Sequence, residues 1–327
     1  MKTLNVNVFF RCNARCVFCV VGLTGGSRST RELSVLEIEH ELQRGYEKGC
    51  RTVTFSGGEP TVYRGLERVV RFARDVGYHG VEVKTNGIRL ATEEVVRSLV
   101  EAGVDLFSVS IHGPRAEVHD ALVGVPRAFE RALWGARRAR ELGAELSLPT
   151  CIQQGNYELL PETVSLLLSL EPRFVLPTFI EPSGSAAFRF EDVVPRYSDV
   201  RPVVEQVCDA LGGTSGFSWA LHGFPLCMIP GYERYSYDLV RGEEIVGGTS
   251  TEDYGSYERE TFRAKSESCG RCSFEAACNG PWKEYVRHRG WSEFQPVEDR
   301  ALIEAIPLPM LARTLFGASA PQAARAC

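Results

Sequence analysis

The chain has 327 residues, of which 44% are hydrophobic and 24% are charged, and its formal net charge is −5. This length can hold one large domain and a smaller one, whereas the negative charge argues against a general nucleic-acid binder. No segment approaches the roughly 20 apolar residues that span a bilayer, and the N-terminus does not resemble an export signal. Because the eleven cysteines are odd in number, we expect a cytoplasmic protein with reduced thiols and metal ligands.

Segments with strand and helix periodicity alternate along the first half of the chain. Strands are predicted near residues 4–9, 52–55, 80–84, 105–111, 145–151 and 173–180. Between strands, stretches such as 34–42 and 127–139 place apolar residues at helical spacing. Six such repeats predict an α/β fold with a parallel sheet, whose functional site lies at the carboxyl ends of the strands.

Three cysteines lie directly after the first predicted strand, in the pattern CxxxCxxC: Cys12, Cys16 and Cys19. Thiolates at this spacing can bind three irons of a cubic iron–sulfur cluster and leave the fourth iron open. A structural zinc site would normally need a fourth protein ligand. The loop resembles that of the radical S-adenosylmethionine (SAM) superfamily, in which an aromatic residue usually precedes the last cysteine, as Phe18 does here. The resemblance implies that Phe18 belongs to the cofactor-binding residues.

A second motif follows the next predicted strand and consists of Gly57, Gly58, Glu59 and Pro60. It resembles the GGEP segment of the superfamily, which implies that its backbone and carboxylate hold the amino group of SAM. The glycines allow a close approach of the backbone, and Glu59 offers an acceptor for an ammonium group.

Two later strand ends resemble further conserved segments of the superfamily and imply that Asn86, Ser108 and Ser110 contact the cofactor. Strand alternation places His112 on the same face as the two serines. We expect a half-buried histidine with satisfied hydrogen bonds there rather than a catalytic group, and Asn156 fits the same layout. The resemblance implies a partial, open (β/α)6 barrel, similar to a TIM barrel.

The pattern changes near residue 195, so we predict a radical SAM core over residues 1–195 and a second domain over residues 196–327. An amphipathic helix is expected around residues 200–211. From Gly212 onward the β-α alternation is lost, which predicts a small α+β domain that ends in a flexible tail.

The second domain contains a further cysteine set: Cys227, Cys269, Cys272 and Cys278. Four thiolates can enclose a second 4Fe–4S cluster or a zinc ion. The spacing resembles the auxiliary-cluster extensions called SPASM or twitch, but Trp282 stands where a full SPASM module has its next cysteine, which implies a single auxiliary cluster. Cys208 could replace Cys278 as the fourth ligand of this cluster. However, Cys208 lies in an apolar helical pattern, which favours a role in core packing.

The two resemblances together imply two 4Fe–4S clusters, SAM as cosubstrate, and an electron donor such as flavodoxin or ferredoxin. The implied enzyme cleaves SAM to a 5′-deoxyadenosyl radical that abstracts hydrogen from a substrate C–H bond. Oxidation, cross-linking and epimerisation remain open as outcomes, and Cys151 is a candidate hydrogen-atom donor for the last.

The substrate class also stays open. With no N-terminal extension to bind a leader peptide, we expect a natural-product small molecule, and a ribosomally made peptide is the alternative if a separate partner binds its leader. A noncatalytic scaffold with a zinc knuckle is the alternative from a different class.

Overall fold

The computed structural model describes residues 2–20, 32–212, 218–240, 244–246 and 254–299. Its centre is a curved sheet of eight strands in the order β7-β6-β5-β4-β3-β2-β1-β8, and every neighbouring pair is parallel. The strands are β1 Thr3–Phe9, β2 Thr52–Gly57, β3 Gly80–Thr85, β4 Leu106–Val109, β5 Glu145–Ile152, β6 Phe174–Phe179, β7 Ser218–Trp219 and β8 Glu244–Val246. The parallel α/β arrangement agrees with the sequence prediction. The predicted flexible tail lies outside the described residues.

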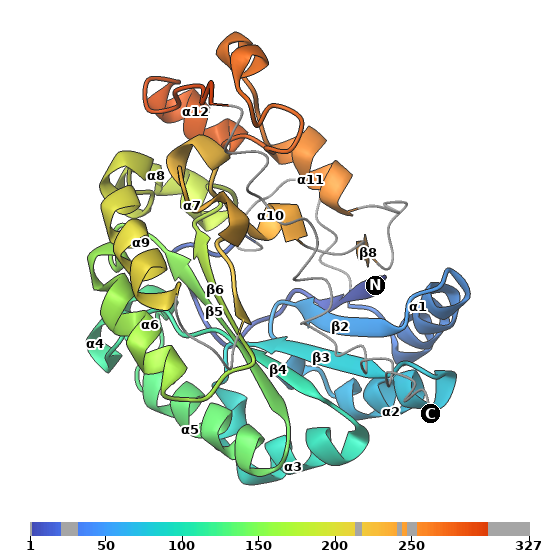
Figure 1. Ribbon diagram of the computed structural model, residues 1–327. Helices are drawn as coiled ribbons and strands as arrows, with labels where there is room; N and C mark the ends of the chain where they lie inside the picture. The colour runs from blue at the N-terminus through green and yellow to red at the C-terminus, as the bar shows by residue number, and fades with distance from the viewer. Residues whose placement is uncertain (1, 21–31, 213–217, 241–243, 247–253, 300–327) are drawn as a thin grey trace, which may run out of the picture.

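Helices cover the outer face of this sheet (Figure 1). They are α1 Val35–Glu47, α2 Leu66–Val76, α3 Glu93–Ala102, α4 Ala116–Val123, α5 Ala128–Glu141 and α6 Leu160–Leu168. The start of α1 shows how local sequence sets a boundary, because Ser34 and Glu37 cap each other's backbone N–H groups. Apolar side chains of β1 to β6 and of α1, α2, α3, α5 and α6 form one continuous buried core, whereas Val123 of α4 belongs to a smaller cluster with Ile88 and Ala128.

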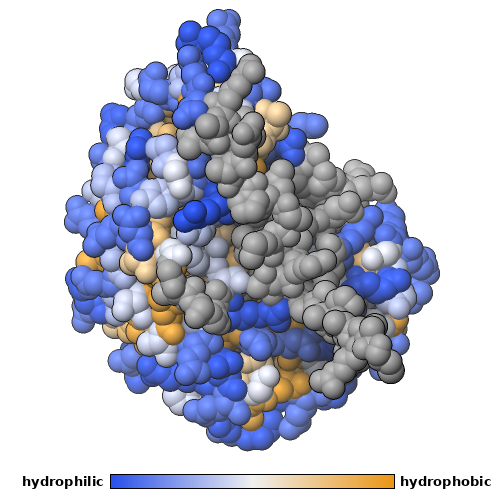
Figure 2. Space-filling view, viewed as in Figure 1, coloured by the Kyte–Doolittle hydropathy of each residue, from blue (hydrophilic) through white to orange (hydrophobic). Residues whose placement is uncertain are grey.

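The remaining helices follow β6. They are α7 Ser185–Phe188, α8 Phe190–Val193, α9 Tyr197–Leu211, α10 Tyr237–Val240, α11 Tyr254–Phe262 and α12 Lys283–Arg289. Helix α9 packs beside α6, whereas α11 and α12 lie beyond the carboxyl ends of the central strands (Figure 1). The visible face of the molecule is largely hydrophilic, with apolar residues in small patches (Figure 2).

All six predicted strands are present, and two short strands add to the edges of the sheet. The fourth strand ends at Val109, two residues earlier than expected, although the next N–H groups still bond to both neighbouring strands: Ser110 donates to Thr85 at 3.0 Å and Ile111 donates to Pro149 at 3.2 Å. Strands β7 and β8 both come from the segment assigned to the second domain. The boundary near residue 195 therefore stays a prediction, and residues beyond it help to build the sheet.

Candidate active site and second cysteine site

The loop with Cys12, Cys16 and Cys19 follows β1 at the carboxyl edge of the sheet and is anchored by backbone hydrogen bonds. The N–H groups of Arg15 and Val17 donate to carbonyls at the end of α4, at 2.9 and 3.0 Å. On the other side, the N–H of Ser185 donates to the Cys19 carbonyl at 2.9 Å. The fold therefore fixes the path of the loop.

The three thiols are close enough to influence one another electrostatically. The pKa of Cys16 is raised to about 12, mainly by burial and also by the neighbouring thiols Cys19 and Cys12. Burial also raises the pKa of Cys12. Thiolates gathered in this way need a positive partner, and iron ions supply one. This donor set fits a cluster held by three protein ligands.

Gly57 and Gly58 lie directly against the chain that enters this loop. A Cβ atom at Gly57 would lie 2.2 Å from the carbonyl oxygen of Phe9, and one at Gly58 would lie 2.1 Å from that of Arg11. The N–H of Gly58 donates to Phe9 at 2.7 Å, and the N–H of Glu59 donates to Arg11 at 2.9 Å. Only glycine allows the two segments to pack at this separation.

The side chain of Glu59 is 1% exposed and already accepts hydrogen bonds from the protein. Its Oε1 accepts from the hydroxyl and the N–H of Thr61, at 2.6 and 3.1 Å, and from the hydroxyl of Thr85 at 2.7 Å. Its Oε2 accepts from the N–H of Asn86 at 2.7 Å. Burial raises the pKa of Glu59, while these bonds lower it. Within the described ranges Oε2 accepts only the bond from Asn86, so the expectation that the carboxylate also holds the amino group of SAM stays a prediction, whereas sequence patterns gave no signal for the two threonines.

Asn86 links the end of β3 to the cysteine loop. Its Nδ2 donates to Asn13 Oδ1 at 2.8 Å and approaches Cys12 Sγ at 3.6 Å. Ser108 lies in β4 and is buried, and the half-buried Ser110 donates its N–H to the carbonyl of Thr85 at 3.0 Å. The structure thus brings the predicted cofactor residues of β2, β3 and β4 to one edge of the sheet.

Phe18 packs its ring edge-on against His112, at a centroid distance of 4.8 Å. His112 is buried, not half-buried as expected. Its Nδ1 accepts from the N–H of Cys151 at 3.1 Å, and its own N–H donates to His119 Nδ1 at 3.0 Å. Burial lowers the pKa of His112 to about 3, so the ring is neutral at pH 7. Asn156 ties these strand ends together, donating to the carbonyls of His112 and Cys151 at 2.8 Å each.

Cys151 lies in β5 at the same edge. It is in register with Thr178 of β6, so their side chains point to the same face of the sheet. Burial raises the pKa of its thiol, and the nearby Cys16 raises it further. The group is therefore an S–H at neutral pH.

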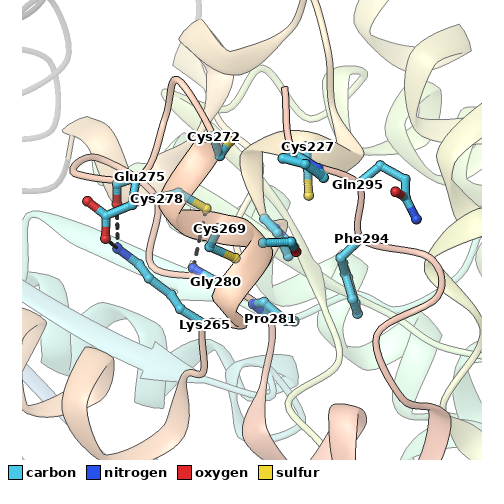
Figure 3. Close-up of a pocket in the computed structure, with 13 residues that line it drawn as sticks. Cys227, Lys265, Cys269, Cys272, Glu275, Cys278, Gly280, Pro281, Phe294 and Gln295 are labelled. Atoms are coloured by element: carbon cyan, nitrogen blue, oxygen red, sulfur yellow. Dashed lines mark hydrogen bonds and ion pairs between the residues drawn. The ribbon is translucent and has the colours of Figure 1, made fainter. Parts of the chain in front are cut away.

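The second cysteine set lines one pocket (Figure 3). The wall of this pocket includes Cys227, Cys269, Cys272 and Cys278, although the first two are 42 positions apart in sequence. Backbone N–H groups of Leu226 and Gly280 donate to Cys278 Sγ at 3.4 and 3.3 Å, as expected around a metal-bound thiolate.

The electrostatics of this pocket are those of clustered thiols. The pKa of Cys227 is raised to about 12. Burial is the largest cause, and the nearby thiols Cys278, Cys272 and Cys269 contribute to the increase in that order. The rival ligand Cys208 is 1% exposed inside α9, among the valines that pack on the core, and is not in the pocket wall. The four thiols that line the pocket fit a closed metal site.

The comparisons with known proteins match this fold and loop. Residues 6–167 match the family model described as "Radical SAM superfamily". Together with the parallel sheet and the cysteine loop, this match makes the chain a radical SAM enzyme, a class that uses a SAM-binding 4Fe–4S cluster and SAM.

Two relatives share sequence over this region. The AdoMet-dependent heme synthase of Methanosarcina barkeri (strain Fusaro / DSM 804) is 34% identical over 173 residues, which are 53% of this chain and 49% of that protein. A probable GTP 3′,8-cyclase of Sulfurisphaera tokodaii is 34% identical over 143 residues, or 44% of each chain. The matched region is less than half the length of these relatives.

Solved structures resemble nearly the whole chain. SuiB of Streptococcus suis bound to S-adenosylmethionine aligns with a TM-score of 0.64 and 17% identity, over 90% of this chain and 76% of that one. The structure of anSMEcpe with AdoMet and the Cp18Cys peptide aligns with a TM-score of 0.60 and 13% identity, over 93% and 94%. At sequence identities of 17% and 13%, the similarity to these structures is a similarity of fold alone. Separately, no helix in the described ranges has the length and apolarity needed to cross a bilayer.

Proposed function

We propose that this enzyme uses SAM to abstract hydrogen from a C–H bond of a peptide or peptide-like substrate, and that a second cluster accepts the electron of the substrate radical. The observation that carries this proposal is the pair of cysteine sites, one of three thiols and one of four. A 4Fe–4S cluster bound by Cys12, Cys16 and Cys19 would supply the electron that cleaves SAM into methionine and a 5′-deoxyadenosyl radical.

In this scheme, residues of the chain bind SAM and hold the neighbouring strand ends in position. We assign the backbone of Gly57 to Pro60, together with Asn86, Ser108 and Ser110, to the binding of SAM. Glu59 acts as a positioning residue, because its carboxylate fixes the N–H of Asn86 and the hydroxyl of Thr85 at the neighbouring strand end. The contact between Phe18 and His112 packs the cysteine loop against the segment that follows β4.

The second pocket supports an auxiliary 4Fe–4S cluster with four protein thiolates, as in SPASM or twitch extensions. Because each iron of this cluster would be bound by a protein thiolate, no iron would be free to bind substrate. The role of the auxiliary cluster would therefore be electron transfer. A flavodoxin or ferredoxin would reduce the enzyme. The peptide class is favoured because structural neighbours include SuiB bound to precursor peptide SuiA, at a TM-score of 0.64, and anSMEcpe with bound peptides.

A second outcome, epimerisation, is supported by Cys151. An epimerase must return a hydrogen atom to the substrate radical, and the half-buried Cys151 thiol, whose pKa is raised, keeps its hydrogen at pH 7. Turnover in D2O distinguishes the outcomes, because an S–D donor places deuterium in the product and simple oxidation does not.

The central test is replacement of Cys16 by Ala in anaerobically reconstituted protein reduced with dithionite. We expect iron to fall from about eight to about four per chain and 5′-deoxyadenosine to become undetectable, since two thiolates cannot hold the first cluster in place. Wild-type 5′-deoxyadenosine yields would refute the proposal. About four iron and one zinc in the wild-type protein would instead favour a zinc knuckle in the second pocket.

A further inference from the structure

A group of buried charged side chains lies next to β7 and outside both cysteine sites. His222 follows β7, Asp238 belongs to α10, Glu258 to α11, and Arg263 directly follows α11. The side chains of Asp238, Glu258 and Arg263 are 6%, 4% and 0% exposed, and that of His222 is 19% exposed. Three separate segments therefore bring two carboxylates, an imidazole and a guanidinium into the protein interior.

Two atoms of this group lack partners. His222 Nε2 and Asp238 Oδ1 are buried, and neither makes a hydrogen bond within the described part of the chain. They lie 3.5 Å apart, and His222 Nε2 lies 3.7 Å from Glu258 Oε1, separations too long for well-formed hydrogen bonds. Since burying polar atoms without partners is costly, their convergence indicates that something binds between them.

The spacing identifies the class of ligand. Nitrogen and oxygen ligands about 2.1 Å from a tetrahedral zinc ion are separated by about 3.4 Å. Two acceptors that share one ammonium at about 2.9 Å would be about 4.7 Å apart. The observed 3.5 and 3.7 Å match the metal, and all three ligand atoms lie within 4.8 Å of one another. An imidazole ligand favours zinc over magnesium or calcium.

We propose that His222 Nε2, Asp238 Oδ1 and Glu258 Oε1 bind a zinc ion with one coordination position open to solvent or substrate. This site is independent of the two cysteine sites and does not rest on the proposed function. His222 pairs with Thr178 of β6, which pairs with Cys151 of β5, so the ion would be bound from the sheet face to which Cys151 also points.

Arg263 explains how such a site tolerates burial. Its Nε and Nη2 donate to Glu258 Oε1 at 3.1 and 2.7 Å, and its guanidinium stacks over Trp282 at 3.3 Å. These contacts fix the Glu258 carboxylate in place. They also add a positive charge, which weakens zinc affinity and favours hydroxide over water at the open position.

The experiment is equilibrium dialysis of the cluster-loaded full chain against ZnCl2, followed by metal analysis and zinc X-ray absorption. The variants are His222→Gln and Asp238→Asn, and the matched control is His79→Gln at an exposed histidine. Asp238→Asn preserves side-chain size, so it tests the site even if His222→Gln fails to fold. Iron is measured in each sample to verify that the cysteines stay occupied.

We expect one zinc per chain in the wild type and in His79→Gln, with nitrogen and oxygen neighbours near 2.0–2.2 Å and no sulfur at 2.3 Å. Zinc should be lost from His222→Gln and reduced at least tenfold in affinity in Asp238→Asn. The proposal is overturned if the wild type binds no zinc, if both variants bind as well as the wild type, or if sulfur surrounds the ion.

Discussion

At the scale of single residues, Glu59 shows how one buried carboxylate can hold a site together. Its two oxygens accept from Thr61 and Thr85 on one side and from Asn86 on the other. Asn86 in turn approaches Cys12. The carboxylate therefore connects the end of β2 with the end of β3 and, through Asn86, with the cysteine loop.

Replacing Glu59 by Gln should lower the free energy of unfolding by about 1.5–3 kcal/mol, the usual contribution of hydrogen bonds to a charged group. A glutamine has only one acceptor oxygen, so its amide would face either the N–H of Asn86 or the threonine donors. Anaerobic urea unfolding followed by circular dichroism measures the change, with exposed Glu67→Gln in α2 as the control. Equal stability of Glu59→Gln and wild type would contradict the positioning role.

At the scale of elements, the Gly57–Gly58 segment and the cysteine loop behave as one packed unit. Their backbones touch at Phe9 and Arg11, and the loop is also held by the ends of α4 and the start of α7. The position of the first cluster is thus set by elements that are distant in sequence.

The substitution Gly58→Ala tests this packing. Its Cβ would lie 2.1 Å from the Arg11 carbonyl oxygen, so the loop must move away, and we expect loss of up to four iron per chain and of 5′-deoxyadenosine formation. Gly270→Ala is the matched control, because a Cβ there meets nothing within 4 Å although it is next to Cys269. Normal iron content in Gly58→Ala would show that the loop adapts without cost.

The elements that could be predicted from the sequence are those that a pattern of neighbouring residues defines. Alternating apolar residues located β1 to β6, and the cysteine spacing located both thiol sets. Strands β7 and β8, with two and three residues, are too short to show a period. The bonds of Glu59 to Thr85 and Asn86 and the proximity of His222 to Asp238 join residues from different elements, so they depend on packing that no local pattern contains.

At the scale of the whole molecule, the two cysteine sites are built by different parts of the chain. The first depends on the sheet and α4, and the second on loops around η4 Leu226–Met228 and η6 Glu267–Arg271. Loss of one site should therefore leave the other assembled.

Cys278→Ala should lower iron by up to four per chain and destabilise the C-terminal region, while SAM cleavage without substrate persists, because closed metal sites contribute folding energy. Cys208→Ala is the contrasting variant: it should keep all iron and cost about 1 kcal/mol of core packing. Iron analysis and 5′-deoxyadenosine assays measure both. If Cys208→Ala loses the auxiliary cluster and Cys278→Ala retains it, the ligand set must be exchanged.

The position of β7 and β8 at opposite edges of the sheet has a consequence for biosynthesis. During translation, β1 to β6 leave the ribosome before either edge strand exists, so the nascent sheet exposes unpaired backbone on both sides. The second edge is closed only after residue 246 has emerged. A chain truncated at residue 195 would keep both edges open permanently and would be prone to pair with other copies of itself.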